Sequence, residues 1–371
     1  MTLMRRRLHQ DNWADKSTGL STGFSTGVST DLSTGISTEI SARVSAPVLT
    51  HRSAGIFTDN PCMTLPETSR QALAPATGLW APKALADFSI YAEPKIDCHC
   101  HILDPARFPY APDVPYEPKG QETGSADYFA HVHAAYGVHH ALLVEPNSGY
   151  GLDNRALLAA IAQGRGRFKG VAMVPLDASR AQLQDLKAQG IVGAAFNVSL
   201  LGLDFYAGIA PLLGHLAALD MFANVQVQDK QLASLSPVLR ASGVRILIDH
   251  CGRPDATHGL HAPGFAALLS LAREGRTAVK LSGFSKFSRA AFPFADTQPF
   301  VKALLETFGP DHCLWASDWP FLRAPSRLDY GPLLQLFAAA VPEASARRKI
   351  LWETPMRLLG FAQPQASASA A

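Results

Sequence analysis

The chain has 371 residues, of which 47% are hydrophobic, and its formal net charge is +2 at pH 7. This length and composition suffice for one barrel of about 250 residues or for two smaller domains. The near-neutral charge provides no basic stripe for a nucleic acid. No apolar run reaches the roughly 18 to 20 residues of a membrane span. We therefore expect neither a nucleic-acid partner nor a membrane partner.

Five cysteines form an odd and sparse set without the spacing of a disulfide framework. The basic residues after Met1 lead into polar residues rather than into the apolar core of a signal peptide. We therefore expect a reduced, cytoplasmic protein that is not secreted.

Residues 17–45 repeat a four-residue unit made of Ser, Thr, a Gly or acidic residue, and an apolar residue. The glycines interrupt any helical stripe, and Ser and Thr are poor helix formers. We predict that residues 1–90 form a low-complexity, disordered tail and that residues 362–371 form a second one. A membrane-surface helix or a self-associating segment is the alternative for the repeat.

From residue 95 onward, short apolar runs alternate with amphipathic runs. The predicted strands are 95–102, 138–145, 168–174, 191–198, 221–228, 244–250, 277–282 and 313–319. The predicted helices are 153–163, 179–189, 206–219, 231–241, 265–274 and 298–308. This alternation predicts an α/β fold, a (β/α)8 TIM barrel over residues 91–361. An open doubly wound sheet is the alternative, but no Gly-x-Gly-x-x-Gly turn follows a strand.

Two histidines, His99 and His101, end the first predicted strand. Strand side chains alternate between faces, so we expect both imidazoles on one side and Cys98 and Cys100 on the other, towards the helix layer. The carboxyl ends of the strands form the catalytic face of a TIM barrel. The two imidazoles are therefore candidates for a site at the barrel mouth.

Polar residues also end other predicted strands. They are Glu145 and Ser148 after the second, Asn197 on the fourth, Gln226 on the fifth, His250 and Arg253 after the sixth, Ser282 at the seventh and Asp318 after the eighth. Three histidines and an aspartate on one face favour a catalytic site over isolated structural histidines.

These residues resemble the amidohydrolase superfamily, specifically the amidohydrolase-related group that contains 2-pyrone-4,6-dicarboxylate lactonase and sugar-acid lactone hydrolases and isomerases. The matching motifs are IDCHCH at 96–101, FPYAP at 108–112, YEP at 116–118, DN at 153–154, DHCGRP at 249–254, WASDWP at 315–320 and TPMRL at 354–358. They occur in the expected order across the whole predicted barrel.

The resemblance implies a hydrolase of carboxylic ester bonds that opens the ring of an acidic lactone. Asp318 would be the general base on water, and His99, His101 and His250 would polarise the scissile carbonyl. The predicted substrate contacts are Tyr116, Ser148, Asn197, Gln226, Arg253, Ser282, Lys286 and Arg289.

Many members of that superfamily bind one or two divalent ions. Here the fourth and fifth strands lack the expected ligands, so only His99, His101, His250 and Asp318 remain. These four residues could hold one Zn²⁺ with an open position for water. On the resemblance to the lactonase group, we favour no obligatory metal and expect no other cofactor.

Two positions depart from the lactonase group: the expected arginine on the fourth strand is Ala195, and the expected tyrosine on the fifth is Gln226. The corresponding basic residue after the seventh strand is Lys286. A less carboxylated or more hydroxylated lactone is therefore expected, since one guanidinium clamp is lost. The alternatives are a sugar-acid lactone isomerase, a zinc-dependent decarboxylase or amidohydrolase, and a catalytically silent binding barrel.

Overall fold

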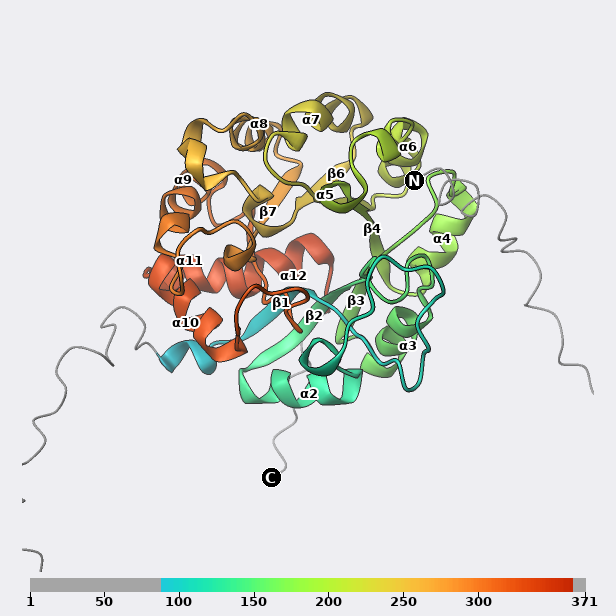
Figure 1. Cartoon of the computed structure of the whole chain (residues 1–371), viewed down its shortest axis with the longest axis horizontal. Coiled ribbons are helices and arrows are strands. Elements are labelled where there is room, and N and C mark those ends of the chain that lie inside the picture. Colours follow the sequence, from blue (N-terminus) through green and yellow to red (C-terminus); the bar gives the residue numbers. More distant parts are fainter. Residues whose placement is uncertain (1–87, 363–371) are drawn as a thin grey trace, which may run out of the picture. The chain divides into compact units, whose positions relative to one another are not determined.

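The computed structural model describes residues 88–362. Eight parallel strands follow one another in chain order, and helices surround them (Figure 1). The strands are β1 Lys95–Cys100, β2 Val138–Val144, β3 Phe168–Ala172, β4 Ile191–Asn197, β5 Phe222–Gln226, β6 Arg245–Ile248, β7 Thr277–Leu281 and β8 Cys313–Trp315. The helices are α2 Ala126–Ala135, α3 Arg155–Gly164, α4 Arg180–Ala188, α5 Val198–Leu201, α6 Ala210–Ala218, α7 Gln231–Ser242, α8 Pro263–Leu271, α9 Gln298–Phe308, α10 Tyr330–Ala340, α11 Ala344–Arg348 and α12 Thr354–Leu359.

The barrel closes where the chain beyond β8 meets β1. The Asp318 backbone N donates to the His99 carbonyl at 2.8 Å, and the His101 backbone N donates to the Trp319 carbonyl at 2.8 Å. The predicted TIM barrel is confirmed, and the open sheet is excluded.

A buried carboxylate, Asp97, reinforces this seam. It accepts from the Ser317 backbone N at 2.9 Å, the Ser317 hydroxyl at 2.5 Å, the Tyr330 hydroxyl at 2.8 Å and the His99 backbone N at 3.2 Å. Burial raises the pKa of Asp97 to about 6, although these hydrogen bonds oppose the rise. The first and last strands are therefore joined through one side chain.

A β-bulge interrupts β1. Asp97 pairs with Ala141 and Cys100 with Leu143, so three steps along β1 match two steps along β2. Cys98 consequently packs inside the barrel, whereas Cys100 packs in the layer between strands and helices. The prediction that both cysteines face the helices was wrong for Cys98, because alternation assumes a regular strand.

The predicted strands are correct in number and order, but several extend too far at the carboxyl end. For example, the last strand was predicted to span residues 313–319, but β8 spans only Cys313–Trp315. Beyond the strands, Asp318, His250 and Arg253 adopt positive φ values of 63°, 53° and 43°. Such backbone conformations are unusual for residues other than glycine and gather at functional sites.

The predicted helices are also largely confirmed. Ser179 caps α4 in a capping box with Gln182, as the sequence start at 179 suggests. The prediction 298–308 coincides with α9, whereas α6 begins at Ala210 rather than at 206 because a short 3₁₀ turn, Asp204–Tyr206, precedes it.

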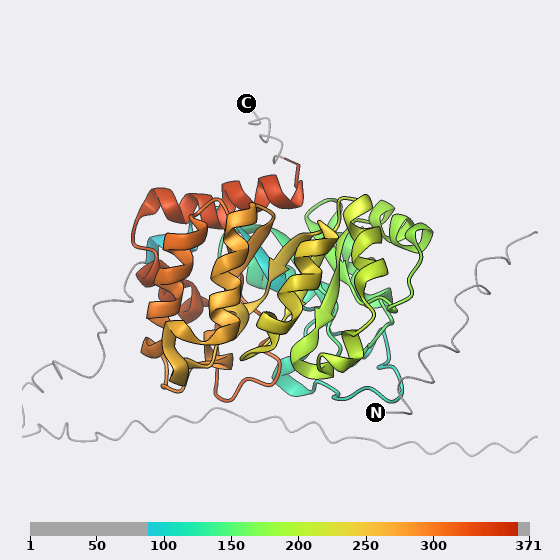
Figure 2. The same cartoon turned by 90° about the horizontal axis from the view of Figure 1, so that it is seen from above.

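The hydrophobic core has two parts. A large layer packs between the strands and the surrounding helices, and a smaller cluster fills the barrel interior. Met356 and Leu359 of α12 and the following Phe361 join Ile96 and Leu314 in the inner cluster. The C-terminal helices lie across one end of the barrel (Figure 2). The opposite end, where the strands finish, is left for a site.

No helix between residues 88 and 362 is both long and apolar enough to cross a bilayer. Most of the two predicted tails, 1–90 and 362–371, lies outside the described residues. The cytoplasmic location likewise stays a prediction.

His133 is a buried histidine on α2. Its ring packs at a tilt against Phe129 with ring centroids 3.8 Å apart, and neither ring nitrogen has a hydrogen-bond partner among the described residues. Burial, aided by the charge of Arg167, lowers its pKa from 6.5 to about 3. Below about pH 6.5 this histidine therefore binds a proton in the unfolded chain but not in the folded chain. The free energy of unfolding consequently decreases as the pH is lowered.

We expect His133 to remove about 2 kcal/mol of unfolding free energy between neutral pH and pH 5, which follows from the shift in pKa. Between the same two pH values, the unfolding free energy of His133→Leu should therefore decrease by about 2 kcal/mol less than that of the wild type. Urea unfolding at both pH values measures the difference, and His131→Leu, at an exposed position of the same helix, is the matched control. Equal pH dependence in wild type and His133→Leu would contradict this expectation.

Candidate active site

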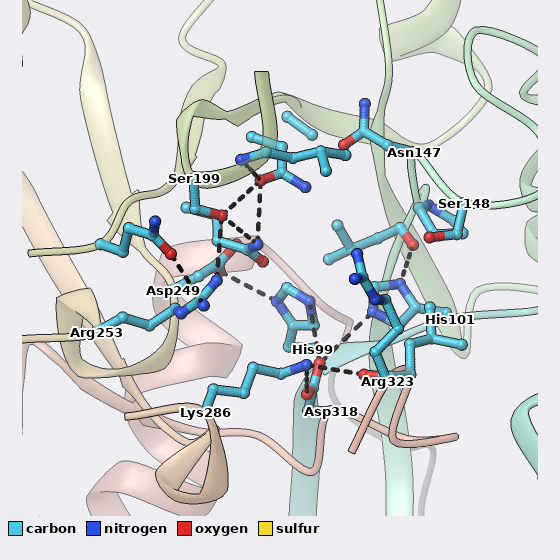
Figure 3. Close-up of a pocket in the computed structure, with 18 of the residues that line it drawn as sticks. His99, His101, Asn147, Ser148, Ser199, Asp249, Arg253, Lys286, Asp318 and Arg323 are labelled. Carbon is cyan, nitrogen blue, oxygen red and sulfur yellow. Dashed lines mark hydrogen bonds and ion pairs between the residues drawn. The ribbon is translucent and has the colours of Figure 1, made fainter. Parts of the chain in front are cut away.

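A cavity of about 640 Å³ lies at the carboxyl ends of the strands. Its lining includes His99, His101, Glu145, Asn147, Ser148, Ala195, Asn197, Ser199, Asn224, Gln226, Gln228, Asp249, Arg253, Lys286, Asp318 and Arg323. Figure 3 shows the histidines and Asp318 between two groups of polar side chains. The cavity is where a TIM barrel carries its chemistry.

Three imidazoles converge on one carboxylate oxygen. Asp318 Oδ1 lies 3.7 Å from Nε2 of His99, 3.6 Å from Nε2 of His101 and 3.6 Å from Nε2 of His250. These separations are too long for direct hydrogen bonds. The sequence thus correctly predicted that these four residues lie together, and their roles remain predictions.

The other ring nitrogens fix how the imidazoles face the cluster. Nδ1 of His101 lies 2.7 Å from the Val144 carbonyl, and Nδ1 of His99 lies 3.1 Å from Asp249 Oδ1. Carbonyl and carboxylate oxygens only accept, so donation by Nδ1 would satisfy both contacts and leave Nε2 facing Asp318, but Lys280 Nζ lies equally close to His99 Nδ1, at 3.1 Å. His250 has more freedom, because its Nδ1 partner is the Ser282 hydroxyl at 3.0 Å.

Asp318 carries its own counter-ion. Lys286 Nζ lies 3.0 Å from Asp318 Oδ2 and also donates to the Leu322 carbonyl at 3.2 Å. Burial alone would raise the pKa of Asp318, but Lys286 and the three surrounding histidines together outweigh burial and hold that pKa well below its usual range. The carboxylate is therefore ionised at neutral pH.

The two deepest imidazoles are neutral. Burial lowers the pKa of His99 to about 4, although the charge of Asp249 opposes the shift, and burial holds the pKa of His250 well below its usual range. Neutral imidazoles can act as ligands or hydrogen-bond partners but bring no positive charge of their own.

Asp249, which lines the cavity, is held by two buried side chains, Lys280 and Asn224. Lys280 Nζ lies 2.8 Å from its Oδ1, and Asn224 Nδ2 donates to its Oδ2 at 2.7 Å. Burial would raise the pKa of Asp249, but His99 and Lys280 outweigh burial and keep that pKa below its usual range.

One wall of the cavity is a network of amide, hydroxyl and guanidinium groups. Ser199 Oγ accepts from Gln226 Nε2 at 2.9 Å and from Arg253 Nη1 at 3.1 Å, and it donates to Asn197 Oδ1 at 2.8 Å. Arg253 Nη2 donates to Gln228 Oε1 at 3.2 Å, while Arg253 Nε is buried without a partner among the described residues. This wall presents cationic and hydrogen-bonding groups to a ligand.

The opposite side carries Asn147 and Ser148 (Figure 3). Glu145 also lines the cavity there, and its buried Oε1 has no hydrogen-bond partner in the described part of the chain. Burial, with a contribution from Asp153, holds the pKa of Glu145 well above its usual range. Burial therefore disfavours the charged form of Glu145, whereas the exposed Arg323 adds a positive charge to the lining.

Three of the predicted substrate-binding residues do not line the cavity. The Tyr116 hydroxyl donates to Glu122, and the Arg323 guanidinium lies 5.6 Å from the centre of its ring. Ser282 is buried beneath the cavity, and Arg289 is exposed at the surface. Ser148, Asn197, Gln226, Arg253 and Lys286 all line it.

The sequence prediction omitted several polar residues that the structure places at or below the site. They are Asn147, Ser199, Asn224, Gln228, Asp249, Lys280 and Arg323. Lys280 gave a usable signal, since a charged residue stands in the middle of an apolar strand. Ser199 and Arg323 gave none, because they come from segments outside the strands.

His99, His101 and Asp318 offer donor atoms that all lie within 4.8 Å of one another. The Nε2 atoms of the two histidines and an ionised carboxylate face the same point. Imidazole and carboxylate are ligands of Zn²⁺, and the carbonyl and carboxylate partners on Nδ1 are the usual supports of metal-binding histidines. The donor set therefore fits one divalent cation.

Comparison with known proteins agrees with this architecture. A family model described as Amidohydrolase matches residues 96–361. The chain is 32% identical over 291 residues to a 4-sulfomuconolactone hydrolase of Rhizobium radiobacter, covering 75% of this chain and 95% of that protein. It is 29% identical over 276 residues to a 2-pyrone-4,6-dicarboxylate hydrolase of Comamonas testosteroni, covering 71% of this chain and 89% of that protein.

Among solved structures, one described as a probable 2-pyrone-4,6-dicarboxylic acid hydrolase from Acinetobacter baumannii, with citric acid bound, superposes with a TM-score of 0.63 at 27% identity. The similarity covers 72% of this chain and 99% of that one. With the family match spanning the whole barrel, the chain belongs to the amidohydrolase family.

Proposed function

We propose that the chain is a hydrolase that opens the ring ester of an anionic lactone, with Asp318 as the general base. The observation that carries this proposal is the ionised Asp318, held by Lys286 at the floor of a cavity with three imidazoles around it. The names of the two relatives describe hydrolases of a sulfonated lactone and of a dicarboxylated pyrone, which supports the same reaction class.

In the proposed reaction, Asp318 takes a proton from a water molecule as its oxygen attacks the lactone carbonyl carbon. The carbonyl oxygen gains negative charge, and the ester C–O bond then breaks. The proton held by Asp318 passes to the departing ring oxygen, so the products are a hydroxy acid or its keto form and the regenerated carboxylate. Lys286 keeps Asp318 ionised between turnovers.

A divalent cation on His99, His101 and Asp318 would supply positive charge at the carbonyl oxygen and lower the pKa of a bound water. The protein's own task is to hold those three donors, and the Nδ1 partners of His99 and His101 do so. The sequence favoured no obligatory metal. The Nε2 lone pairs favour a cation instead, since neutral imidazoles in this tautomer cannot donate to an oxyanion.

The lining charges point to an anionic substrate. Lys286 is engaged by Asp318, so Arg253 and Arg323 are the cationic groups that remain for a ligand within the described cavity. Arg253 is better placed than Lys286 to bind a carboxylate or sulfonate. The amide and hydroxyl groups of Asn197, Ser199 and Gln226 suit further oxygens of the substrate.

Asp318→Asn should preserve the fold and lower the turnover of an anionic lactone by on the order of a hundredfold or more, because positioned proton transfer contributes about 10²–10⁴. Steady-state kinetics on a lactone panel measures the change, and NMR of the product separates ring opening from migration of the ring ester. Asp311→Asn, at an exposed aspartate paired with Lys349, is the matched control. Wild-type turnover in Asp318→Asn would remove Asp318 from the mechanism.

Arg253→Met should raise the Michaelis constant for an anionic lactone about ten- to a hundredfold and change turnover much less, because a remote anion anchor acts on ground and transition states alike. A neutral lactone of similar size should lose little. Arg348→Met, at an exposed arginine paired with Glu353, controls for loss of charge. Equal losses on both lactones would show that Arg253 acts on the structure rather than on the anion.

Elemental analysis should find about one equivalent of zinc per chain after incubation with Zn²⁺, as expected for a single three-ligand site. His101→Asn should lose most of that zinc. Removal of the ion with a chelator should lower hydrolysis, and Zn²⁺ should restore it. Full hydrolysis by demonstrably metal-free protein would show that the residues act without a cation.

A further inference from the structure

Lys280 is a buried lysine that the proposed reaction does not use. It stands in the middle of β7, and none of its surface is exposed. Its neighbour two residues earlier, Ala278, belongs to the cluster inside the barrel, so Lys280 also points inward. It does not line the cavity.

Lys280 forms a closed ring with two other buried side chains. Lys280 Nζ lies 2.8 Å from Asp249 Oδ1 and donates to Asn224 Oδ1 at 2.6 Å, and Asn224 Nδ2 donates to Asp249 Oδ2 at 2.7 Å. We call these three residues the buried frame. The frame links β5, the residue directly after β6, and β7. It also gives each oxygen of the Asp249 carboxylate a hydrogen-bond or ion-pair partner.

The buried frame ends on a residue of the imidazole cluster. Asp249 Oδ1, which Lys280 holds, is the same oxygen that lies 3.1 Å from His99 Nδ1. Lys280 Nζ itself lies 3.1 Å from that Nδ1. The ring nitrogen can donate to Asp249 or accept from Lys280, but not both, so the frame decides which way His99 faces.

Barrel stability alone does not require this arrangement. A buried ion pair pays the desolvation of both charges, and replacing such a pair with apolar residues of similar size is often neutral or stabilising. The neighbouring interior positions of this barrel are apolar. A buried lysine and aspartate aimed at an active-site imidazole are thus better explained by what they do to that imidazole.

We propose that Lys280 is a positioning residue, which with Asn224 fixes the Asp249 carboxylate so that Asp249 holds His99 with Nδ1 protonated and Nε2 directed at Asp318. The inference rests on the proposed function, since it takes His99 to be one of the residues around Asp318 that take part in lactone opening. A purely structural frame would instead tie three strands together, and its loss would lower stability while leaving turnover and the His99 tautomer unchanged.

Kinetics of Lys280→Met, Asp249→Asn and the double variant test the proposal. Each single variant should lower turnover about ten- to a hundredfold, as expected for a support of an active-site histidine, and should leave the Michaelis constant within about threefold. The double variant should be no slower than the slower single variant, because both changes act through one chain of contacts. Lys302→Met, at an exposed lysine paired with Glu306 on α9, is the matched control and should behave as wild type.

NMR of protein with ¹⁵N-labelled histidine provides a readout that a structural role would not move. The His99 signal, identified by its absence in His99→Asn, should show a protonated Nδ1 and an unprotonated Nε2 in wild type. Lys280→Met should show a second tautomer or a mobile ring. A wild-type His99 protonated on Nε2, or a Lys280→Met variant with wild-type turnover and spectrum, would overturn the proposal.

Two outcomes need a second measurement: a Lys280→Met variant that does not fold, and a wild type that opens no lactone. If Lys280→Met does not fold, Asn224→Ala removes two hydrogen bonds of the frame but keeps the ion pair between Lys280 and Asp249, and it should change turnover and the His99 signal in the same direction. If the wild type opens no lactone, the proposed function fails, while the ¹⁵N spectra of wild type and variants still decide whether the frame sets the His99 tautomer.

Discussion

The active site depends on the hydrogen bonds of Asp97, which join the first strand to the chain beyond the last one. That carboxylate holds the backbone N of His99 on one side and the backbone N and hydroxyl of Ser317 on the other. His101, two residues after His99, and Asp318, directly after Ser317, face each other across the same seam. Closing the barrel and assembling the imidazole cluster are thus one event, since a barrel left open there would separate the histidines from the carboxylate.

Two acids that line the cavity are each paired with a lysine. Lys280 neutralises Asp249, and Lys286 neutralises Asp318. Each acid is therefore kept ionised in a place where burial would otherwise protonate it. The remaining cations, Arg253 and Arg323, belong to the walls rather than to the floor, so the same cavity combines a buried carboxylate with positive charge that is available to a ligand.

Much of this could be predicted from the sequence because the strands of a TIM barrel bring their ends together. His99, His101, His250 and Asp318 each follow or end a strand, so their order along the chain was sufficient to place them at one mouth. The pairing of Lys286 with Asp318 was beyond that reasoning, since Lys286 lies in a short 3₁₀ turn after β7 and Asp318 has a positive φ beyond β8. Cys98 was misplaced for a related reason, because a bulge in β1 breaks the alternation on which the prediction relied.

The residues that hold the imidazoles and Asp318 differ from the residues that shape the rest of the cavity. This difference affects how the substrate preference of such a barrel can evolve. Ala195 lines the cavity from β4 with one methyl group, and it makes none of the hydrogen bonds that hold the imidazoles. A larger or charged side chain there would reshape the space offered to a ring substituent while the base and its supports stayed in place. Substitutions at this position are therefore a short route to new lactone preferences, for natural selection and for laboratory evolution alike.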